Sequence, residues 1–306
     1  MGDLFDRRRQ INLLTAKVCR ESFLSPIIER GIETHIIAGN HDIYWKNTNE
    51  VNSLTEFVMG RNNNVNVYTS PKLINIDGLD IQLIPWISDA NEKESLDAIL
   101  TTRAEILMGH LEIVGFEMHR GALSTYGKAQ DLFSRFDLVF SGHFHHKSSL
   151  GNIHYLGAFG EYTWSDYNDP RGFTIFDTET RNFEFIQNEN RLFHMISYDD
   201  VKNDYTTNIS NFDYLKDCFV KVVCVNRTNP YTFDLFMEKL YDSSPYDIVV
   251  IEDSEFAEET GEEKLDIVDT EDIIKNYIKN SKVDVDRDKM IEYMNEIYRE
   301  SLNMDE

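Results

Sequence analysis

The chain has 306 residues, of which 41% are hydrophobic and 12% aromatic, enough to bury one large core and one or two small appendages. This composition excludes a globally disordered protein, and no stretch approaches the roughly 18 apolar residues of a membrane span. The net charge of −24 argues at first sight against nucleic-acid binding, but residues 251–306 hold half of that excess, with 19 acidic and 7 basic side chains.

The first half of the chain alternates between helical and strand patterns. In chain order it predicts a helix over 11–31 that ends at Gly31, a strand over 34–40, a helix over 50–59 and strands over 64–69, 72–77 and 79–86. Two apolar runs, AEILMGH (104–110) and DLVFSGH (137–143), each lead into a glycine and a polar residue. Runs that are apolar on both faces are typical of central strands in a sheet that is covered on both sides.

The remaining patterns define the predicted domains. Strands over 152–157, 172–178 and 182–188 are expected to be antiparallel members of a second sheet, which gives an αββα sandwich for residues 1–195. Residues 196–251 are predicted to be a small α+β cap domain with a β-α-β unit, and residues 252–267 an acidic linker. Residues 268–306 are predicted to form a helical pair, whose apolar stripes include Ile274, Ile278, Met290, Met294 and Ile297.

Four polar clusters lie at or just beyond the ends of predicted strands. They are Gly2-Asp3-x-x-Asp6, Gly39-Asn40-His41-Asp42, Gly109-His110 and Gly142-His143-Phe144-His145. Loops beyond the carboxyl ends of parallel strands are where open α/β sheets build their sites. Residues two apart in an extended segment point the same way, so His143 and His145 can face one site. Carboxylate, amide and imidazole ligands together suit Mn²⁺, Fe²⁺ or Zn²⁺ better than Ca²⁺.

Each cluster taken alone is more often an ordinary turn or a hydrogen-bonded core residue than a metal ligand. All four in this order and in this strand context indicate descent from a phosphoesterase. The other histidines have no comparable support and are predicted to be strand, loop or surface residues; these are His35, His119, His146, His154 and His194. The three cysteines show no paired-ligand spacing, which indicates reduced core thiols in a cytoplasmic protein.

The motifs GDLFD, GNHD, GH and GHFH resemble those of calcineurin-like metallophosphoesterases over residues 1 to about 190. The segments IQLIPW, GHLE, SGHFH and DPRGF (169–173) together resemble the SbcD-type DNA-repair nucleases, most closely the phage nuclease subunits of the T-even type. The resemblance implies an αββα metallophosphoesterase sandwich with a small cap domain and a C-terminal helical pair. For a phage-encoded member, it implies action in the host cytoplasm.

The resemblance implies a role for each matching residue. Asp3 would bridge two divalent metal ions, most simply Mn²⁺, and Asn40, His110 and His143 would ligate the second of them. His145 would ligate the first metal. His41 would act catalytically near the leaving oxygen, and Asp6 would orient it from behind. Arg7 occupies a position that binds phosphate in some relatives, although a solvated turn over residues 7–9 is at least as good an interpretation.

One motif of the resemblance has no counterpart in this sequence. The family begins with a strand that ends in Asp-x-His and supplies two ligands to the first metal, and none of the nine histidines here has an aspartate two residues before it. The sandwich is therefore expected with its first strand missing and with a weakly held first metal. We expect Met1 to be an internal methionine of a longer reading frame.

The function that the resemblance implies is metal-dependent hydrolysis of phosphodiester bonds at DNA ends or nicks, in recombination and repair. The implied partners are DNA and an ABC-type, SbcC-like ATPase bound by the C-terminal helices, with no membrane partner. The resemblance is also compatible with a homodimer of this chain within a hetero-tetramer. Two alternatives stay open: a non-catalytic assembly subunit, or a small-molecule or protein phosphoesterase of the same fold. Metal titration separates the first alternative from the enzymes.

Overall fold

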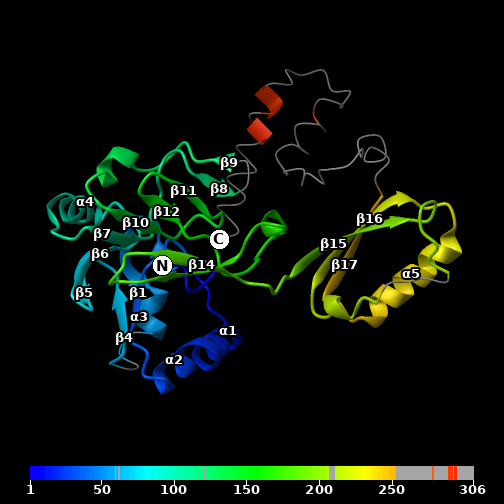
Figure 1. Ribbon diagram of the computed structural model, residues 1–306, viewed down its shortest axis with the longest axis horizontal. Coiled ribbons are helices and arrows are strands. Elements are labelled where there is room, and N and C mark those ends of the chain that lie inside the picture. The colour runs from blue at the N-terminus through cyan, green and yellow to red at the C-terminus, as the bar shows by residue number, and fades with distance from the viewer. Residues whose placement is uncertain are drawn as a thin grey trace. The chain divides into compact units, whose positions relative to one another are not determined.

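The computed structural model describes residues 1–58, 60, 63–119, 122–206 and 211–252, together with 278, 289–291 and 293–294. These residues belong to two compact units (Figure 1). The first unit comprises Met1–Ala158, Pro170–Gln187 and Ile274–Glu306, and the second comprises Phe159–Asp169 and the chain from Asn188 to Ile273. The domain boundary predicted at residue 195 falls within a strand of the second unit. The predicted acidic linker and most of the C-terminal helical pair lie outside the described residues.

A six-stranded sheet forms the centre of the first unit. In spatial order its strands are β11 (Ser148–Leu150), β12 (Ile153–Tyr155), β10 (Leu138–Ser141), β7 (Ile106–Gly109), β6 (Leu79–Ile84) and β5 (Lys72–Ile76). The four inner strands are parallel, and the two edge strands run antiparallel to their neighbours. The register pairs Ile84 with Gly109 and Gly109 with Ser141. The loops after β6, β7 and β10 therefore leave the sheet at the same edge.

A second layer lies against one face of this sheet. It contains the parallel pair β1 (Thr34–Ile37) and β4 (Val65–Tyr68) and the antiparallel pair β13 (Gly172–Phe176) and β14 (Phe183–Gln187). Ile37 packs with Ile81, Ile106 and Phe140 of the large sheet, and the Phe140 and Phe176 rings are 5.3 Å apart. Both strand layers therefore share one apolar interface.

Helices cover the outer faces of the two strand layers. Ile36 and Ala38 point away from the large sheet into a cluster with Leu24 and Leu54, which come from the N-terminal helical segment and from α3. On the opposite face of the large sheet, Ile99 of α4 packs into the main core. The layer order is thus helix, sheet, sheet, helix, which confirms the predicted sandwich. The helices are α1 (Leu13–Val18), the π-helical turn η1 (Cys19–Leu24), α2 (Ser25–Glu29), α3 (Ser53–Phe57) and α4 (Glu92–Thr101).

The structure corrects the sequence analysis in several places. The strand predicted over 152–157 does not belong to the second sheet, because β12 pairs in parallel with β10. Its two buried residues, Ile153 and Tyr155, belong to the main core and hold it there. Helix α4 was also missed; its apolar residues fall in its second half and are too few to show a helical repeat, and they are Leu96, Ala98, Ile99 and Leu100. Short elements also not predicted are β2 (Ile43–Trp45), β3 (Thr48–Asn52), β8 (Glu117–His119), β9 (Ala122–Leu123) and the 3₁₀ turns η2 (Gln130–Phe133), η3 (Trp164–Asp166) and η4 (Asp213–Leu215).

The second unit has a three-stranded parallel sheet of its own. Its strands are β15 (Phe193–Asp199), β16 (Phe219–Asn226) and β17 (Asp247–Glu252), and α5 (Pro230–Asp242) connects the last two. The predicted β-α-β unit is therefore present. Phe233, Phe236 and Leu240 of α5 pack against Val220 and Val222 of β16. No helix in the described part of the chain is long and apolar enough to cross a membrane.

One buried hydroxyl joins β12 to the segment that follows β7. The Tyr155 hydroxyl accepts a hydrogen bond from the Ile113 N–H at 3.0 Å and donates one to the Leu111 carbonyl at 2.9 Å. Tyr155 is 1% exposed, so water does not replace these partners easily. This hydroxyl fixes the chain immediately after His110.

We expect Tyr155→Phe to lower the free energy of unfolding by about 1–3 kcal/mol, because it leaves a buried N–H and a buried carbonyl without their partner. Urea-induced unfolding measures the change. The control is Tyr126→Phe, which removes a hydroxyl from a residue that is 74% exposed, and it should change the value by less than about 0.5 kcal/mol. Equal effects of the two substitutions would contradict this role of the Tyr155 hydroxyl.

Candidate metal centre

Four loops bring the predicted ligands to one place. Asp3 lies in the N-terminal segment, Asn40 follows β1, His110 follows β7 and His143 follows β10. The strand register places the ends of β7 and β10 side by side, because Gly109 pairs with Ser141. A hydrogen bond from the Trp86 N–H to the Ala38 carbonyl, 2.7 Å long, joins the end of β1 to the loop after β6. Residues far apart in the chain therefore meet at one edge of the fold.

The donor atoms of these residues converge closely. One ligand atom from each of Asp3, His110 and His143 lies within 4.8 Å of the other two. The Asn40 Oδ1 atom lies 2.9 Å from His110 Nε2 and 2.9 Å from His143 Nδ1, and an Asp3 carboxylate oxygen lies 3.1 Å from His110 Nε2. Two oxygen and two nitrogen donors thus surround one small volume, a set that fits a divalent transition-metal ion.

The hydrogen bonding of His110 supports this fit. Its Nδ1 lies 2.7 Å from the Met1 carbonyl oxygen, which can only accept a hydrogen bond, so we assign the proton to Nδ1. In the neutral ring, Nε2 then directs a lone pair toward the oxygens of Asp3 and Asn40. The Nε2 lone pair and these oxygens are all acceptors, so a proton or a cation is needed between them. An outer hydrogen bond to a carbonyl is also the usual way in which proteins orient a metal-binding histidine.

The backbone at the centre is held in uncommon conformations. Asp3 has φ of 57° and His143 has φ of 82°, both in the left-handed region that side chains other than glycine seldom adopt. The glycines before two of the ligands have a steric reason, to which Gly2 adds a positive φ of 89°. A Cβ on Gly39 would lie 2.1 Å from the Asp3 carboxylate, and one on Gly2 would lie 2.2 Å from His110 Nδ1. Close packing therefore requires glycine immediately before Asp3 and immediately before Asn40.

Asp42 ties two of the ligand loops together. Its carboxylate accepts hydrogen bonds from the backbone N–H groups of Asp3 at 2.8 Å, Leu4 at 3.1 Å and Gly39 at 2.9 Å, and from the Ser53 hydroxyl at 3.1 Å. Asp42 is fully buried. Burial raises the pKa of Asp42, and the hydrogen bonds from Gly39 and Ser53 oppose that shift by stabilising the ionised form.

Electrostatics favour the ligand states that a metal requires. Burial disfavours the charged form of Asp3, but a protonated His110, through its charge and a hydrogen bond from Nε2, together with His41, outweighs burial and holds the pKa of Asp3 below its usual range. Burial, aided by the neighbouring His110, lowers the pKa of His143 to about 3. At neutral pH the carboxylate is therefore ionised and the His143 ring is neutral, and both can coordinate a cation.

His41 contacts the centre without contributing its ring to the ligand group. Its backbone N–H donates to an Asp3 carboxylate oxygen at 2.8 Å. Its ring Nδ1 lies 2.6 Å from the backbone carbonyl of Asp6, so the predicted support from Asp6 comes from the main chain and not from the carboxylate. Because a carbonyl only accepts, Nδ1 carries a proton, and an additional proton would reside on Nε2.

Two predicted residues lie outside the ligand group. His145 is exposed and is not among the three residues whose ligand atoms cluster. Its backbone carbonyl accepts a hydrogen bond from an Arg171 guanidinium nitrogen and another from the Ala158 N–H at 3.1 Å. Arg7 is exposed as well. The structure thus brings together Asp3, Asn40, His110 and His143, and leaves the His145 and Arg7 side chains at the surface.

Three residues at the centre were not singled out as site residues from the sequence. Asp42 and Arg171 are 0% and 2% exposed, and they hold the loops before and after the ligands. Trp86 places its ring centroid 5.1 Å from that of His143 and 6.1 Å from that of His110. All three lie within segments that stood out by resemblance: GNHD, DPRGF and IQLIPW. For Asp42 and Arg171, the feature that could have identified them as site residues was a charged residue, buried in the fold, within a loop motif.

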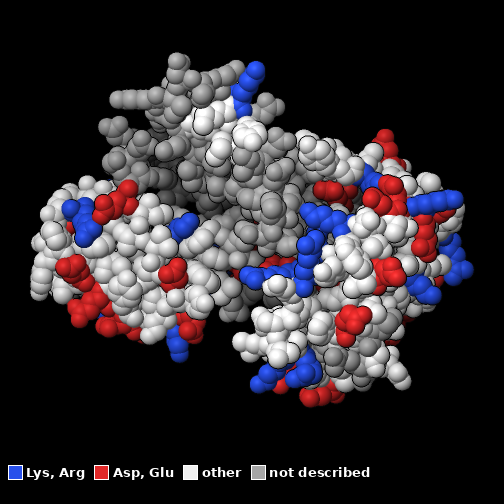
Figure 2. All heavy atoms as spheres, turned by 180° about the vertical axis from the view of Figure 1, so that it is seen from behind, with Lys and Arg blue, Asp and Glu red and all other residues white. Residues whose placement is uncertain are grey.

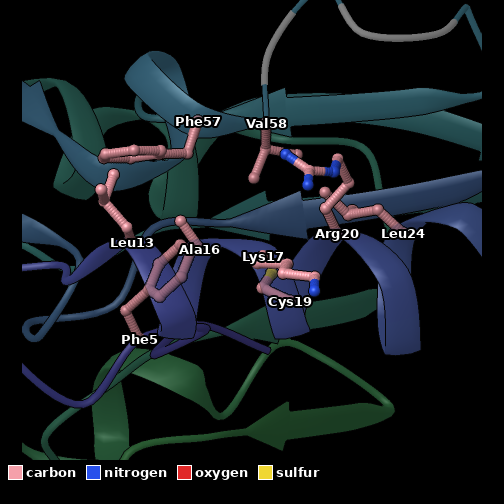
Figure 3. A pocket seen from close by; sticks show the side chains of 9 residues that line it. All are labelled: Phe5, Leu13, Ala16, Lys17, Cys19, Arg20, Leu24, Phe57 and Val58. Atoms are coloured by element: carbon pink, nitrogen blue, oxygen red, sulfur yellow. The ribbon is translucent and has the colours of Figure 1, made fainter.

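A separate cavity lies behind the N-terminal loop. It has a volume of about 360 Å³ and lies between the N-terminal helical segment and α3 (Figure 3). Phe5, Leu13, Leu24, Phe57 and Val58 give it a mainly apolar lining, with Lys17 and Arg20 at its wall (Figure 3). It has no carboxylate or imidazole in its lining, so it lacks the ligand chemistry of the metal centre.

Replacing Asp42 tests the role of its carboxylate. We expect Asp42→Asn to lower the free energy of unfolding by more than about 2 kcal/mol, because an amide accepts fewer of these hydrogen bonds and brings an N–H group among donors. Ser53→Ala, which removes only one of the donors to Asp42, should cost about 1 kcal/mol or less. A smaller loss for Asp42→Asn than for Ser53→Ala in urea titrations would show that the carboxylate does not hold the loops.

Known proteins agree with this geometry. The calcineurin-like phosphoesterase model matches residues 1–147. Exonuclease subunit 1 of Enterobacteria phage T4 is 34% identical over 306 residues, which cover 98% of this chain and 86% of that protein. The SbcD component of the SbcCD nuclease from Staphylococcus epidermidis is 30% identical over 109 residues, covering 33% of this chain and 29% of that protein. The resemblance inferred from the motifs is thereby confirmed, and the chain belongs to the calcineurin-like phosphoesterase family.

Proposed function

We propose that this chain is the nuclease subunit of a DNA-processing complex and hydrolyses phosphodiester bonds in DNA with two divalent metal ions, most simply Mn²⁺. The observation that carries the proposal is the convergence of the Asp3, Asn40, His110 and His143 donor atoms. The names of the relatives, an exonuclease subunit and a nuclease subunit, support DNA as the substrate. A phage enzyme of this kind would work in the host cytoplasm, where its DNA lies.

The residues of the centre suit such a reaction. When bound, the metal ions supply Lewis acidity and an activated water for attack on phosphorus. Asp3, Asn40, His110 and His143 would hold these ions, and His145 would join them through a change in its side-chain position. His41 is placed to donate a proton from Nε2 to the departing oxygen, because its Nδ1 is already engaged with the Asp6 carbonyl. The hydrogen bond from the His41 N–H to Asp3 would keep His41 beside the metal ions that Asp3 holds.

The charge distribution is compatible with contact to a DNA backbone at a limited surface. Figure 2 shows Lys and Arg side chains gathered on the first unit, with acidic side chains scattered over both units. Arg7 is exposed and follows Asp6, whose carbonyl contacts the His41 ring, and we propose that Arg7 contacts phosphate. Because the chain as a whole is acidic, a partner would supply much of the non-specific attraction for DNA.

Metal binding and chemistry should separate in two histidine variants. We expect His143→Ala to weaken Mn²⁺ binding at least tenfold, because it removes a ligand from the centre. His41→Ala should retain Mn²⁺ and lower the rate of DNA hydrolysis about 10²- to 10⁴-fold, because it removes a proton donor and no ligand. Calorimetric titration with Mn²⁺ and single-turnover rates measure the two effects. Equal loss of metal in both variants would refute the division of roles.

We further propose that the C-terminal segment binds an ABC-type, SbcC-like ATPase. The apolar residues expected to make this contact are Ile274, Ile278, Met290, Met294 and Ile297. Ile278 is buried, and Met290 and Met294 are half-buried, whereas Ile274 and Ile297 lie outside the described residues. Both relatives are named as subunits, which supports a partner for this chain. A homodimer inside a hetero-tetramer would present two such segments.

Deleting residues 265–306 should abolish co-purification with the ATPase and leave Mn²⁺ binding at Asp3, Asn40, His110 and His143 unchanged. Ile274→Asp combined with Met294→Asp should weaken the complex at least tenfold, because both place a charge in an apolar contact. Pull-down with quantified affinity decides between this segment and other surfaces. Undiminished binding by the truncated chain would move the partner contact to the core or the second unit.

A further inference from the structure

A polar cavity of about 300 Å³ opens beside the metal centre. His110 belongs to both, because it lines the cavity and also contacts Asp3 and Asn40. The other wall residues used below are Trp86, Ser88 and Glu112. A group attached to a phosphate at the metal centre would therefore reach this cavity directly.

Trp86 gives the cavity a rigid aromatic wall. Its backbone N–H donates to the Ala38 carbonyl at 2.7 Å, and its carbonyl accepts from the side chains of Asn49 at 2.9 Å and Asn91 at 3.0 Å. Its ring packs against the His110 and His143 rings, and its side chain is half-buried. An aromatic surface fixed in this way is suited to stacking with a flat ring.

The charges around the cavity exclude an anion as its ligand. Three carboxylates line it, those of Asp89, Glu92 and Glu112, against the single ammonium of Lys128. That ammonium is already paired with Glu92. A phosphate group would meet repulsion here, whereas a neutral ligand with N–H donors would find acceptors.

Ser88 adds an unsatisfied polar atom to the wall. It is 4% exposed, and among the residues that the structure describes its hydroxyl has no hydrogen-bond partner. Buried hydroxyls are nearly always hydrogen-bonded in folded proteins, so one without a partner in a cavity wall indicates a site for a ligand or an ordered water. A hydroxyl can donate to a ring nitrogen or carbonyl and accept from an amino group.

We infer that this cavity binds the nucleobase of the nucleotide whose phosphate lies at the metal centre. Trp86 stacks on the base, and the Ser88 hydroxyl and the Glu112 carboxylate hydrogen-bond its edge. The inference rests on the proposed function and adds a base-binding subsite to it. The two parts of the nucleotide would occupy chemically different sites. The anionic phosphate would lie at the cation site, and the neutral base would lie in the cavity, which is acidic and has an aromatic wall.

Binding of modified DNA tests the subsite without relying on catalysis. The probe is a fluorescent, hydrolysis-resistant phosphorothioate single strand in which one base at a time is replaced by an abasic residue, and anisotropy with Mn²⁺ gives its Kd. For the wild-type chain, one abasic position should weaken binding about 5- to 100-fold, the range of base–aromatic stacking. In Trp86→Ala the intact strand should bind weakly and that abasic position should have no further effect.

The controls separate stacking from damage to the neighbouring ligands. Trp86→Phe should restore most of the penalty at the same position, because phenylalanine keeps an aromatic face. A merely structural role of Trp86 would weaken binding of intact and abasic strands equally, and that outcome overturns the subsite. The subsite is also overturned if no abasic position affects the wild-type chain. No binding of any strand by the wild-type chain, either alone or together with its ATPase partner, would instead refute DNA as the substrate, and the inference with it.

Discussion

The buried carboxylate of Asp42 is the contact on which the metal centre depends. It accepts N–H groups from Asp3 and Leu4 on the N-terminal loop and from Gly39 on the loop after β1. The left-handed backbone of Asp3 costs on the order of 1–3 kcal/mol and persists only where its surroundings enforce it. Charge-assisted hydrogen bonds from successive backbone N–H groups supply that enforcement. The bond from the His41 N–H to the Asp3 carboxylate then adds a second link between the same two loops.

Main-chain carbonyls then decide which ring nitrogens face the reacting groups. The Met1 carbonyl engages Nδ1 of His110, and the Asp6 carbonyl engages Nδ1 of His41. Each Nδ1 is therefore engaged, although the two rings have different tasks. His110 directs a lone pair from Nε2 toward the oxygens of Asp3 and Asn40, and His41 lies beside Asp3, to whose carboxylate its backbone N–H donates. The same N-terminal segment that supplies a ligand thus also sets the tautomers of two histidines.

The sequence was sufficient for the layers of the fold and for the four candidate ligands whose side chains meet, because apolar runs ending in glycine mark both the strands and the loops after them. It was insufficient for β12, whose three residues carry no indication of strand direction; the parallel pairing with β10 depends on burial of Tyr155. It also missed Asp42, Trp86 and Arg171 as site residues, since each acts through tertiary contacts. His145 illustrates the same limit. Its spacing from His143 suggested a shared direction, but His143 has φ of 82°, so the segment is not extended.

In the function proposed here, holding the metals and choosing the substrate would fall to different parts of the fold. The ligands sit on loops pinned by the sheet register, by Asp42 and by the Arg171 contact to the His145 carbonyl. Trp86 sits on the loop after β6 and is positioned through its own backbone by Asn49 and Asn91, neither of which is a ligand. A change in the Trp86 side chain therefore alters one wall of the neighbouring cavity without removing the hydrogen bonds that the Trp86 backbone makes with Ala38, Asn49 and Asn91. Members of one phosphoesterase family can in this way keep a common metal centre and differ in the group that they accept beside it.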